Sequence, residues 1–246
     1  MEDLGTRLTL MNMSRIRRNV AVIGAGWAGC AAAVELARRG CEVHLYEAAR
    51  IAGGRARRID LHGQALDNGQ HILLGAYRDT LHVMHLVGLE PASLLLRLPL
   101  QMRYPGQGDG MQLIAPRLPA PLHMALGVLR ATGLSGADKL AMARFASAAR
   151  WMDWQLNVDC TVSELLQRFD QTERLIRLLW RPLCIAALNT APDRASANVF
   201  LNVLRDSLAA KRQASDMLLP RVDLSALFPD AALAYVEKHG GTEIGR

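Results

Sequence analysis

The segment from Asn19 to Glu47, NVAVIGAGWAGCAAAVELARRGCEVHLYE, constrains the fold more than any other part of the chain. Its apolar run Val20–Ile23 is typical of a buried parallel strand. The stretch from Trp27 to Arg39 is rich in Ala and Leu and predicts a helix, with Gly40 as its C-terminal stop. The alternating residues Cys41 to Glu47 predict a second strand. Strand, turn, helix and strand in this order predict an α/β fold with a parallel sheet.

Three glycines of this segment have the G-x-G-x-x-G spacing that suits a dinucleotide. The helix N-terminus offers free N–H groups and a partial positive charge to a pyrophosphate. Gly24 would begin the tight turn, Gly26 would let the backbone approach the ligand, and Gly29 would let helix and strand pack closely. Glu47 ends the second strand, where a carboxylate can accept hydrogen bonds from a ribose. The alternative is a glycine-rich turn that binds nothing.

Two later stretches extend the predicted site. Gly53 and Gly54 allow a backbone turn against a ligand, and the guanidinium of Arg55 suits a phosphate. The polar turn Asp67 to His71 precedes an apolar segment, and its backbone amides could lie against a flat ring. The residues of this turn that follow Asp67 are Asn68, Gly69, Gln70 and His71.

These motifs together resemble the FAD-binding start of the amine oxidase and phytoene desaturase superfamily. DNGQHILLGAY (Asp67 to Tyr77) and RPLCIAALNT (Arg181 to Thr190) are similar to one branch, the squalene-associated FAD-dependent desaturases or hydroxysqualene dehydroxylases. The resemblance runs from about Asn19 to the last residue. It implies a Rossmann-like FAD-binding domain with an α+β substrate domain, and an isoprenoid small molecule as substrate. The implied reaction reduces hydroxysqualene to squalene with loss of water, in hopanoid biosynthesis.

The resemblance also implies roles for single residues. The three glycines of the first turn would hold the pyrophosphate, Glu47 the adenosine ribose and Arg55 the phosphates, and the flavin would supply the hydride chemistry. Loss of a hydroxyl requires a proton donor at the leaving oxygen. His71 is the predicted catalytic donor because it is titratable and adjoins the presumed ring contact. The alternative is that His71 only binds backbone and shapes the turn.

The middle of the chain predicts a hairpin and several helices. Strands are predicted within Leu94 to Tyr104 and at Met111 to Ile114, followed by an apolar helix over Leu118 to Leu134. This part either covers the core or dips into a bilayer to collect an isoprenoid. Further helices are predicted over Ser135 to Val158, Thr161 to Thr190 and Ala195 to Arg212. A capping box is predicted at Thr161 and Glu164, and Ser135 or Asp138 as the cap of the preceding helix. Trp151, Trp154 and Trp180 are predicted to lie in the core or in a pocket wall.

The predicted domain organisation follows from these elements. It comprises a tail (1–17), an FAD-binding part (18–90), a largely helical substrate domain (91–240) and the start of a return strand (241–246). A dinucleotide fold requires more than two strands, and little before Thr242 qualifies as a third. We therefore expect an incomplete FAD-binding domain in a truncated or split-gene chain that carries no tightly bound flavin. A non-catalytic remnant is the alternative of another class.

Composition narrows the partners. The net charge of +6 is spread along the chain without a dense Lys/Arg tract, which argues against nucleic acid. The four cysteines form no C-x-x-C pair and predict reduced thiols in a cytosolic protein; we predict no metal site. No run of 18 apolar residues exists to span a bilayer, so the expected location is the cytoplasm or the inner face of the cytoplasmic membrane. A carotenoid-type desaturase, an amine oxidase and an NAD-dependent dehydrogenase are the enzymatic alternatives.

Overall fold

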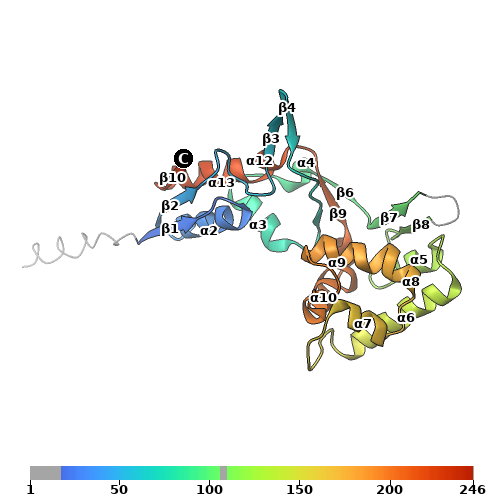
Figure 1. Cartoon of the computed structure of the whole chain (residues 1–246). Coiled ribbons are helices and arrows are strands. Elements are labelled where there is room, and N and C mark those ends of the chain that lie inside the picture. The colour runs from blue at the N-terminus through green and yellow to red at the C-terminus, as the bar shows by residue number, and fades with distance from the viewer. Residues whose placement is uncertain (1–17, 106–109, 246) are drawn as a thin grey trace, which may run out of the picture. The chain divides into compact units, whose positions relative to one another are not determined.

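The computed structural model describes residues 18–105 and 110–245. These residues form two compact units (Figure 1). The first unit contains 18–71, 79–95 and 220–245, and the second contains 72–78, 96–105 and 110–219. Each unit is described here by itself.

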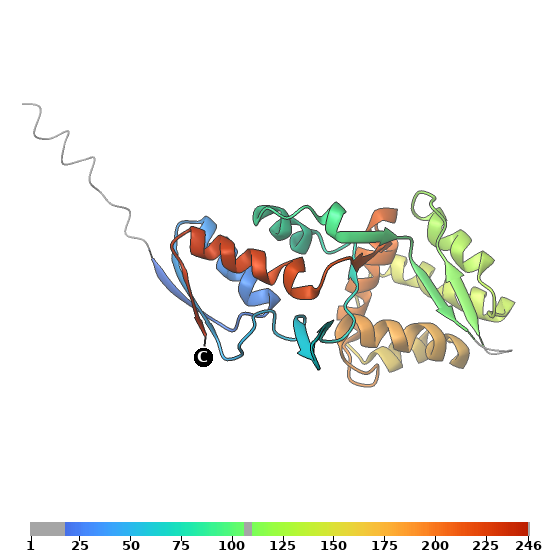
Figure 2. The same cartoon turned by 90° about the horizontal axis from the view of Figure 1, so that it is seen from above.

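The first unit is built on a parallel three-stranded sheet. Its strands lie in the order β1 (Asn19–Ile23), β2 (Glu42–Glu47) and β10 (Thr242–Gly245). Helix α2 (Trp27–Arg38) connects β1 to β2, and α13 (Pro229–Lys238) leads into β10. The two helices pack side by side along the sheet (Figure 2). The strand predicted to begin at Thr242 is present, and it pairs with β2. This unit is Rossmann-like, as predicted.

Small side chains allow α2 to lie close to the strands. Its buried residues are Cys30, Ala33, Val34 and Ala37. Their spacing of three and four residues places them on one face of the helix. Because most of them are small, the helix axis can approach the buried side chains of β2, which are Val43 and Leu45.

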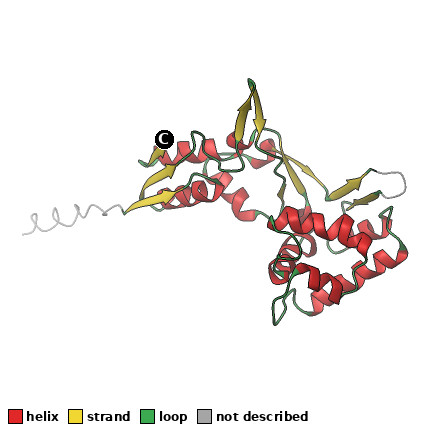
Figure 3. Ribbon diagram, in the orientation of Figure 1, coloured by secondary structure: helices red, strands yellow, loops and turns green. Residues whose placement is uncertain are grey.

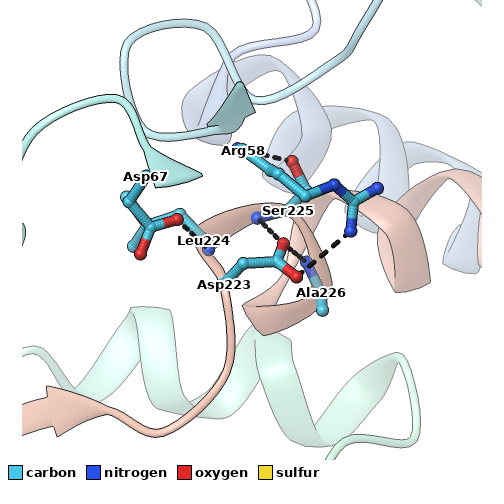
Figure 4. A network of polar contacts seen from close by, with 6 residues as sticks. All are labelled: Arg58, Asp67, Asp223, Leu224, Ser225 and Ala226. Carbon is cyan, nitrogen blue, oxygen red and sulfur yellow. Dashed lines mark hydrogen bonds and ion pairs between the residues drawn. The ribbon is translucent and has the colours of Figure 1, made fainter. Parts of the chain in front are cut away.

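A β-hairpin of the first unit is tied to the segment before α13. The hairpin comprises β3 (Arg58–Leu61) and β4 (Gln64–Asp67), which pair antiparallel. An Asp67 carboxylate oxygen accepts a hydrogen bond of 2.8 Å from the Leu224 N–H (Figure 4). Asp223 caps α12 (Leu224–Leu227) and pairs with Arg58 at 3.1 Å. Asp67 therefore stabilises the fold by holding the hairpin to the start of α12. The unit also contains the helices α3 (Arg78–Leu86) and α4 (Pro91–Leu94).

The second unit is mostly helical (Figure 3). It contains the sheet order β5 (Leu73–Leu74), β9 (Met217–Pro220), β6 (Leu95–Leu98), and the antiparallel pair β7 (Gln101–Tyr104) and β8 (Met111–Ile114). Its helical segments are α5 (Leu122–Arg130), α6 (Gly136–Trp151), α7 (Val162–Arg168), α8 (Glu173–Leu175), η1 (Ile176–Trp180), α9 (Arg181–Leu188), α10 (Ala197–Leu204), η2 (Arg205–Ala209) and α11 (Arg212–Ser215). The predicted α+β character of this part is confirmed.

Several predicted helices are shorter or broken in the structure. The predicted helix over Thr161 to Thr190 is interrupted because Asp170 has φ 49° and Thr172 caps a new helix. The one over Ser135 to Val158 ends at Trp151, since Asp153 and Trp154 are left-handed, with φ 50° and 57°. Tertiary context thus overrides the continuous apolar pattern. The capping boxes at Ser135 and Thr161 are both formed.

The two other predicted helices are also trimmed. The helix predicted over Leu118 to Leu134 is α5, which spans only Leu122–Arg130 because Pro119 and Pro121 precede it and Gly133 has φ 74°. The helix predicted over Ala195 to Arg212 is α10 followed by η2.

The compact units divide the chain differently from the predicted bounds of 18–90 and 91–240. Residues 220–240 lie in the first unit, because α13 packs on α2 and the Trp27 ring lies 5.2 Å from that of Phe228. This pairing joins residues about two hundred positions apart, and it has no local sequence signal.

Candidate functional site

The turn between β1 and α2 leaves the start of the helix open to an anion. Gly24 has φ 92°, and its N–H donates to the Tyr46 carbonyl at 2.7 Å. Gly26 is the N-cap of α2; no side chain caps the helix, and its first turn holds no acidic residue. The first N–H groups of a helix have no partner within it. They are therefore available to a phosphate.

Gly29 packs against the same turn. A Cβ at Gly29 would lie 1.8 Å from the Gly24 carbonyl oxygen. Only a glycine lets the helix begin this close to the strand end. The contacts of Gly29 agree with its predicted packing role, because any side chain at this position would require α2 to move.

A second glycine turn lies against the first. The Gly53 N–H donates to the Ala25 carbonyl at 2.7 Å, and Gly53 forms an isolated parallel bridge with Gly26. Gly53 and Gly54 have φ 110° and 63°. A Cβ on Gly54 would lie 3.1 Å from the Gly26 Cα. The structure therefore brings together two glycine motifs that are 27 residues apart in the sequence (26 to 53).

Glu47 holds the end of β2 to the first turn. One carboxylate oxygen accepts a hydrogen bond of 2.7 Å from the Ala25 N–H, and the other accepts one of 2.8 Å from the Ala49 N–H. The hydrogen bond from Ala49, followed by that from Ala25, holds the pKa of Glu47 below its usual value despite partial burial. The carboxylate is thus ionised and fixed beside the α2 N-terminus. Its contact with a ribose stays a prediction.

Trp27 and Arg57 hold the second glycine turn in place, and neither role was predicted from the sequence. The Trp27 indole N–H donates to the Ala56 carbonyl at 2.9 Å. The Arg57 guanidinium donates to the Gly54 carbonyl at 2.6 Å. Trp27 occupies a variable position of the first glycine motif, and Arg57 stands two residues after Arg55, so neither carried a distinct signal. Arg55 itself is exposed, and its contact with a phosphate stays a prediction.

The turn predicted to face a flavin ring adjoins the second glycine turn at one residue. The Asn68 side-chain amide donates to the Arg55 carbonyl at 3.1 Å. Gly69 and Gln70 are exposed, as is Asn68. His71 is half-buried and its Nδ1 lies 3.2 Å from the Gly69 carbonyl oxygen, which is the backbone contact of the alternative reading. The catalytic role of His71 stays a prediction.

The second unit contains an apolar cavity of about 500 Å³. It is lined from β7 and β8, from α5 and α6, and from the η1, α9 and η2 region. The lining is aliphatic and aromatic, apart from Lys139, Ser147 and Arg150. Trp154 and Trp180 line it, as predicted for a pocket wall. Trp151 does not, because it points outward from the end of α6 with 92% of its surface exposed.

Comparison with known proteins shows what these features are similar to. A family model described as an NAD(P)-binding Rossmann-like domain matches residues 22–87. Hydroxysqualene dehydroxylase of Sinorhizobium fredii is 30% identical over 92% of this chain and 52% of its own length. That of Rhodopseudomonas palustris is 30% identical over 93% of this chain and 53% of its own length. The chain is a homologue of the hydroxysqualene dehydroxylases. The resemblance seen in the motifs is confirmed.

This hydroxysqualene dehydroxylase homologue spans about half the length of the curated relatives it matches. Zeta-carotene desaturase of Zea mays is 28% identical over 90% of the chain and 41% of its own length. Two solved structures share the fold, each over about half of its own chain. An oxidoreductase from Methanosarcina mazei has a TM-score of 0.65 at 17% identity, covering 92% of this chain and 51% of its own. Putrescine oxidase has a TM-score of 0.60 at 16% sequence identity, and the match covers 93% of this chain and 51% of the putrescine oxidase chain.

The glycine cradle of the hydroxysqualene dehydroxylase homologue fits a nucleotide cofactor. A Cβ on Gly24 would meet nothing within 4 Å, so space lies open above the turn. The uncapped helix start, this space and the ionised Glu47 are what an adenosine diphosphate group requires. Among the residues that the structure describes, no three His, Cys, Asp or Glu side chains gather in a way that could hold a metal ion.

Proposed function

We propose that this chain binds FAD and belongs to an oxidoreductase that converts hydroxysqualene to squalene with loss of water. The observation that carries the proposal is the uncapped start of α2, set between two abutting glycine turns and the carboxylate of Glu47. The names of the relatives with 30% identity supply the reaction.

The cofactor roles follow from the cradle. The first N–H groups of α2 would hold the diphosphate, with Gly26 leaving room for its approach. Glu47 would accept hydrogen bonds from the adenosine ribose, and Arg55 would contact the phosphates. Asn68, Gly69 and Gln70 would lie near the isoalloxazine. Reduced FAD supplies the hydride that replaces the hydroxyl.

The apolar cavity of the second unit supports an isoprenoid substrate. Its volume of about 500 Å³ lies in the range of small-molecule pockets, about 300–1,000 Å³. A hydrocarbon chain gains free energy from burial against such a lining. His71 is the proposed proton donor to the leaving hydroxyl. The site of action would be the cytoplasm or the inner face of the cytoplasmic membrane. No helix in residues 18–105 and 110–245 is long and apolar enough to cross a bilayer.

A carotenoid-type desaturase is the second candidate. The similarity to zeta-carotene desaturase over 90% of the chain favours it, and its substrate is also a long isoprenoid. An amine oxidase shares only the fold at the identities found.

Two assays test the proposal. The first titrates the purified chain with FAD and with NAD and measures the heat of binding by isothermal titration calorimetry. The chain should carry no tightly bound flavin as purified, and we expect it to bind added FAD saturably. Glu47→Gln should weaken this binding at least tenfold, and Glu35→Gln should leave it unchanged, since Glu35 is a half-buried carboxylate of the same unit whose partners are Arg38 and Arg39. Equal binding by both variants, or binding of NAD alone, would contradict the cofactor assignment.

The second assay incubates the chain with FAD, a chemical reductant and hydroxysqualene or zeta-carotene. Squalene, detected by mass spectrometry, is the expected product. Turnover of zeta-carotene alone, with an electron acceptor in place of the reductant, would favour the desaturase instead. FAD binding without turnover of either substrate would favour the non-catalytic alternative.

A further inference from the structure

The cavity of the second unit is walled on one side by α5 and α6, and both helices carry an outward stripe beside the stripe that lines the cavity. We propose that this outward surface, the α5–α6 face, docks on an anionic lipid bilayer and that the cavity fills from it. The delivery of an isoprenoid by this route rests on the proposed function. The docking itself stands on the surface alone.

The residues of α6 fall into three stripes at 3.6 residues per turn. The buried stripe includes Phe145 and Ala149. Besides the buried Met142 and Phe145, five further residues of α6 line the cavity and form the cavity stripe, namely Lys139, Ala143, Ala146, Ser147 and Arg150. The outward stripe consists of Leu140, Arg144 and Trp151, all exposed. The outward stripe directly borders the cavity stripe on the helix surface, so the rim of the cavity is continuous with the outer face of α6.

Helix α5 repeats this arrangement. Its buried positions are His123 and Gly127, and Met124 and Val128 line the cavity. Leu122 and Leu129 are 57% and 68% exposed. Leu129 also lines the cavity, so one side chain belongs both to the rim and to the outer surface. The ammonium of Lys139 donates to the Leu129 carbonyl at 2.8 Å, which holds the two helices together at this rim.

The exposed charged side chains of α5 and α6 are basic, and the nearest exposed acid that follows along the chain is Asp153, two residues after Trp151. Residues 110–152 contain one acid, Asp138, which is buried in the capping box of α6. They contain five cations, namely Arg117, Arg130, Lys139, Arg144 and Arg150. Arg130, Arg144 and Arg150 are exposed and have no ion-pair partner among the described residues. A basic side chain near an anionic bilayer surface contributes about 1 kcal/mol.

The combination of exposed apolar and basic side chains favours a bilayer over an acidic protein as the occupant. Leu122, Leu129 and Leu140 would gain free energy by entering the acyl boundary. Trp151, at the end of α6, is of the residue type enriched at membrane–water interfaces. The cations would remain at the level of the headgroups, and a substrate dissolved in the acyl layer would meet the cavity rim at Leu129.

Vesicle co-sedimentation tests the docking. The probes are phosphatidylcholine vesicles with and without phosphatidylglycerol, with neither FAD nor substrate present. We expect the chain to bind the anionic vesicles more tightly, and the double variant Arg144→Glu/Arg150→Glu to weaken this at least tenfold. Arg194→Glu is the matched control, an exposed arginine elsewhere in the second unit, and should bind as the wild type does. Leu122→Ser/Leu129→Ser should weaken binding at high salt, where the apolar part dominates.

Circular dichroism of each variant confirms that it folds. Equal binding to neutral and anionic vesicles, absence of vesicle binding, or equal loss in the Arg194 control would overturn the docking. Because the assay contains no FAD and no substrate, these results would leave the proposed function intact. Conversely, if the chain bound vesicles normally but did not bind FAD, the proposed function would be overturned and the docking would stand.

Discussion

The contact between Gly29 and the turn at Gly24 makes Gly29→Ala the most informative single substitution. The new Cβ would lie 1.8 Å from the Gly24 carbonyl oxygen, whereas real Cβ contacts essentially never fall below 3.0 Å. Relief requires α2 and the turn to separate by about 1.2 Å, the difference between these two distances. Both partners are backbone, so no flexible side chain can yield.

The expected cost follows from two opposing terms. Overpacking of this kind costs about 1–3 kcal/mol, and the upper end applies because backbone must move. Alanine in place of glycine within a helix returns about 1 kcal/mol. We therefore expect the first unit to lose about 2 kcal/mol, which raises the equilibrium constant for local opening of α2 about 30-fold. FAD affinity should fall with it, since the helix start leaves its place above the turn.

Hydrogen exchange followed by mass spectrometry measures this locally at residues 27–38. The control is Gly136→Ala, the same change at the start of α6, where a Cβ would meet nothing within 4 Å. Protection of α6 should be kept or slightly increased there. Unchanged protection of α2 in Gly29→Ala would refute the reasoning, as would an equal loss in both variants.

Three further predictions concern buried or fixed ionisable groups. Glu47→Gln should reduce the stability of the first unit above pH 4.5 and flatten the pH dependence of that stability. In the wild type the Ala49 and Ala25 amides lower the pKa of Glu47, so this stability is lost as the pH falls below 4.5. Asp138→Ala should lower the melting temperature of the second unit by removing acceptors for Ser135 and Thr172, a loss of about 1–3 kcal/mol seen by calorimetry. His123→Leu should stabilise the second unit, because both ring nitrogens are buried without a partner among the described residues. Burial lowers the pKa of His123, so the wild type should lose stability below pH 6.5 in urea titrations while this variant does not; a parallel decline would contradict this.

Local chemistry made the first unit readable from the chain. The glycine spacing, the apolar run of β1 and the acid at the end of β2 are close in sequence and encode a structure that needs no distant partner to be recognised. The capping boxes at Ser135 and Thr161 were likewise predictable, because each joins residues only three positions apart. Helix ends at Asp153 and Asp170 were not, since left-handed backbone at aspartate depends on packing around it.

The features that could not be predicted from the sequence depend on contacts between residues that are far apart in the chain. The clamp of Trp27 on Ala56, the packing of α13 on α2 and the outward position of Trp151 each depend on where another part of the chain lies. The cavity in the second unit arises in the same way, because its walls come from elements that are more than a hundred residues apart, from Leu100 to Ala209.

The sequence by itself determined that a strand, a glycine turn and a helix follow one another with an open helix start, because three glycines and one helix start are local geometry. The tertiary structure decided that a second glycine turn closes on the first. It also decided that the exposed faces of α5 and α6 adjoin an apolar cavity. Such arrangements depend on the burial of side chains from remote segments, and no periodicity within a single segment records them.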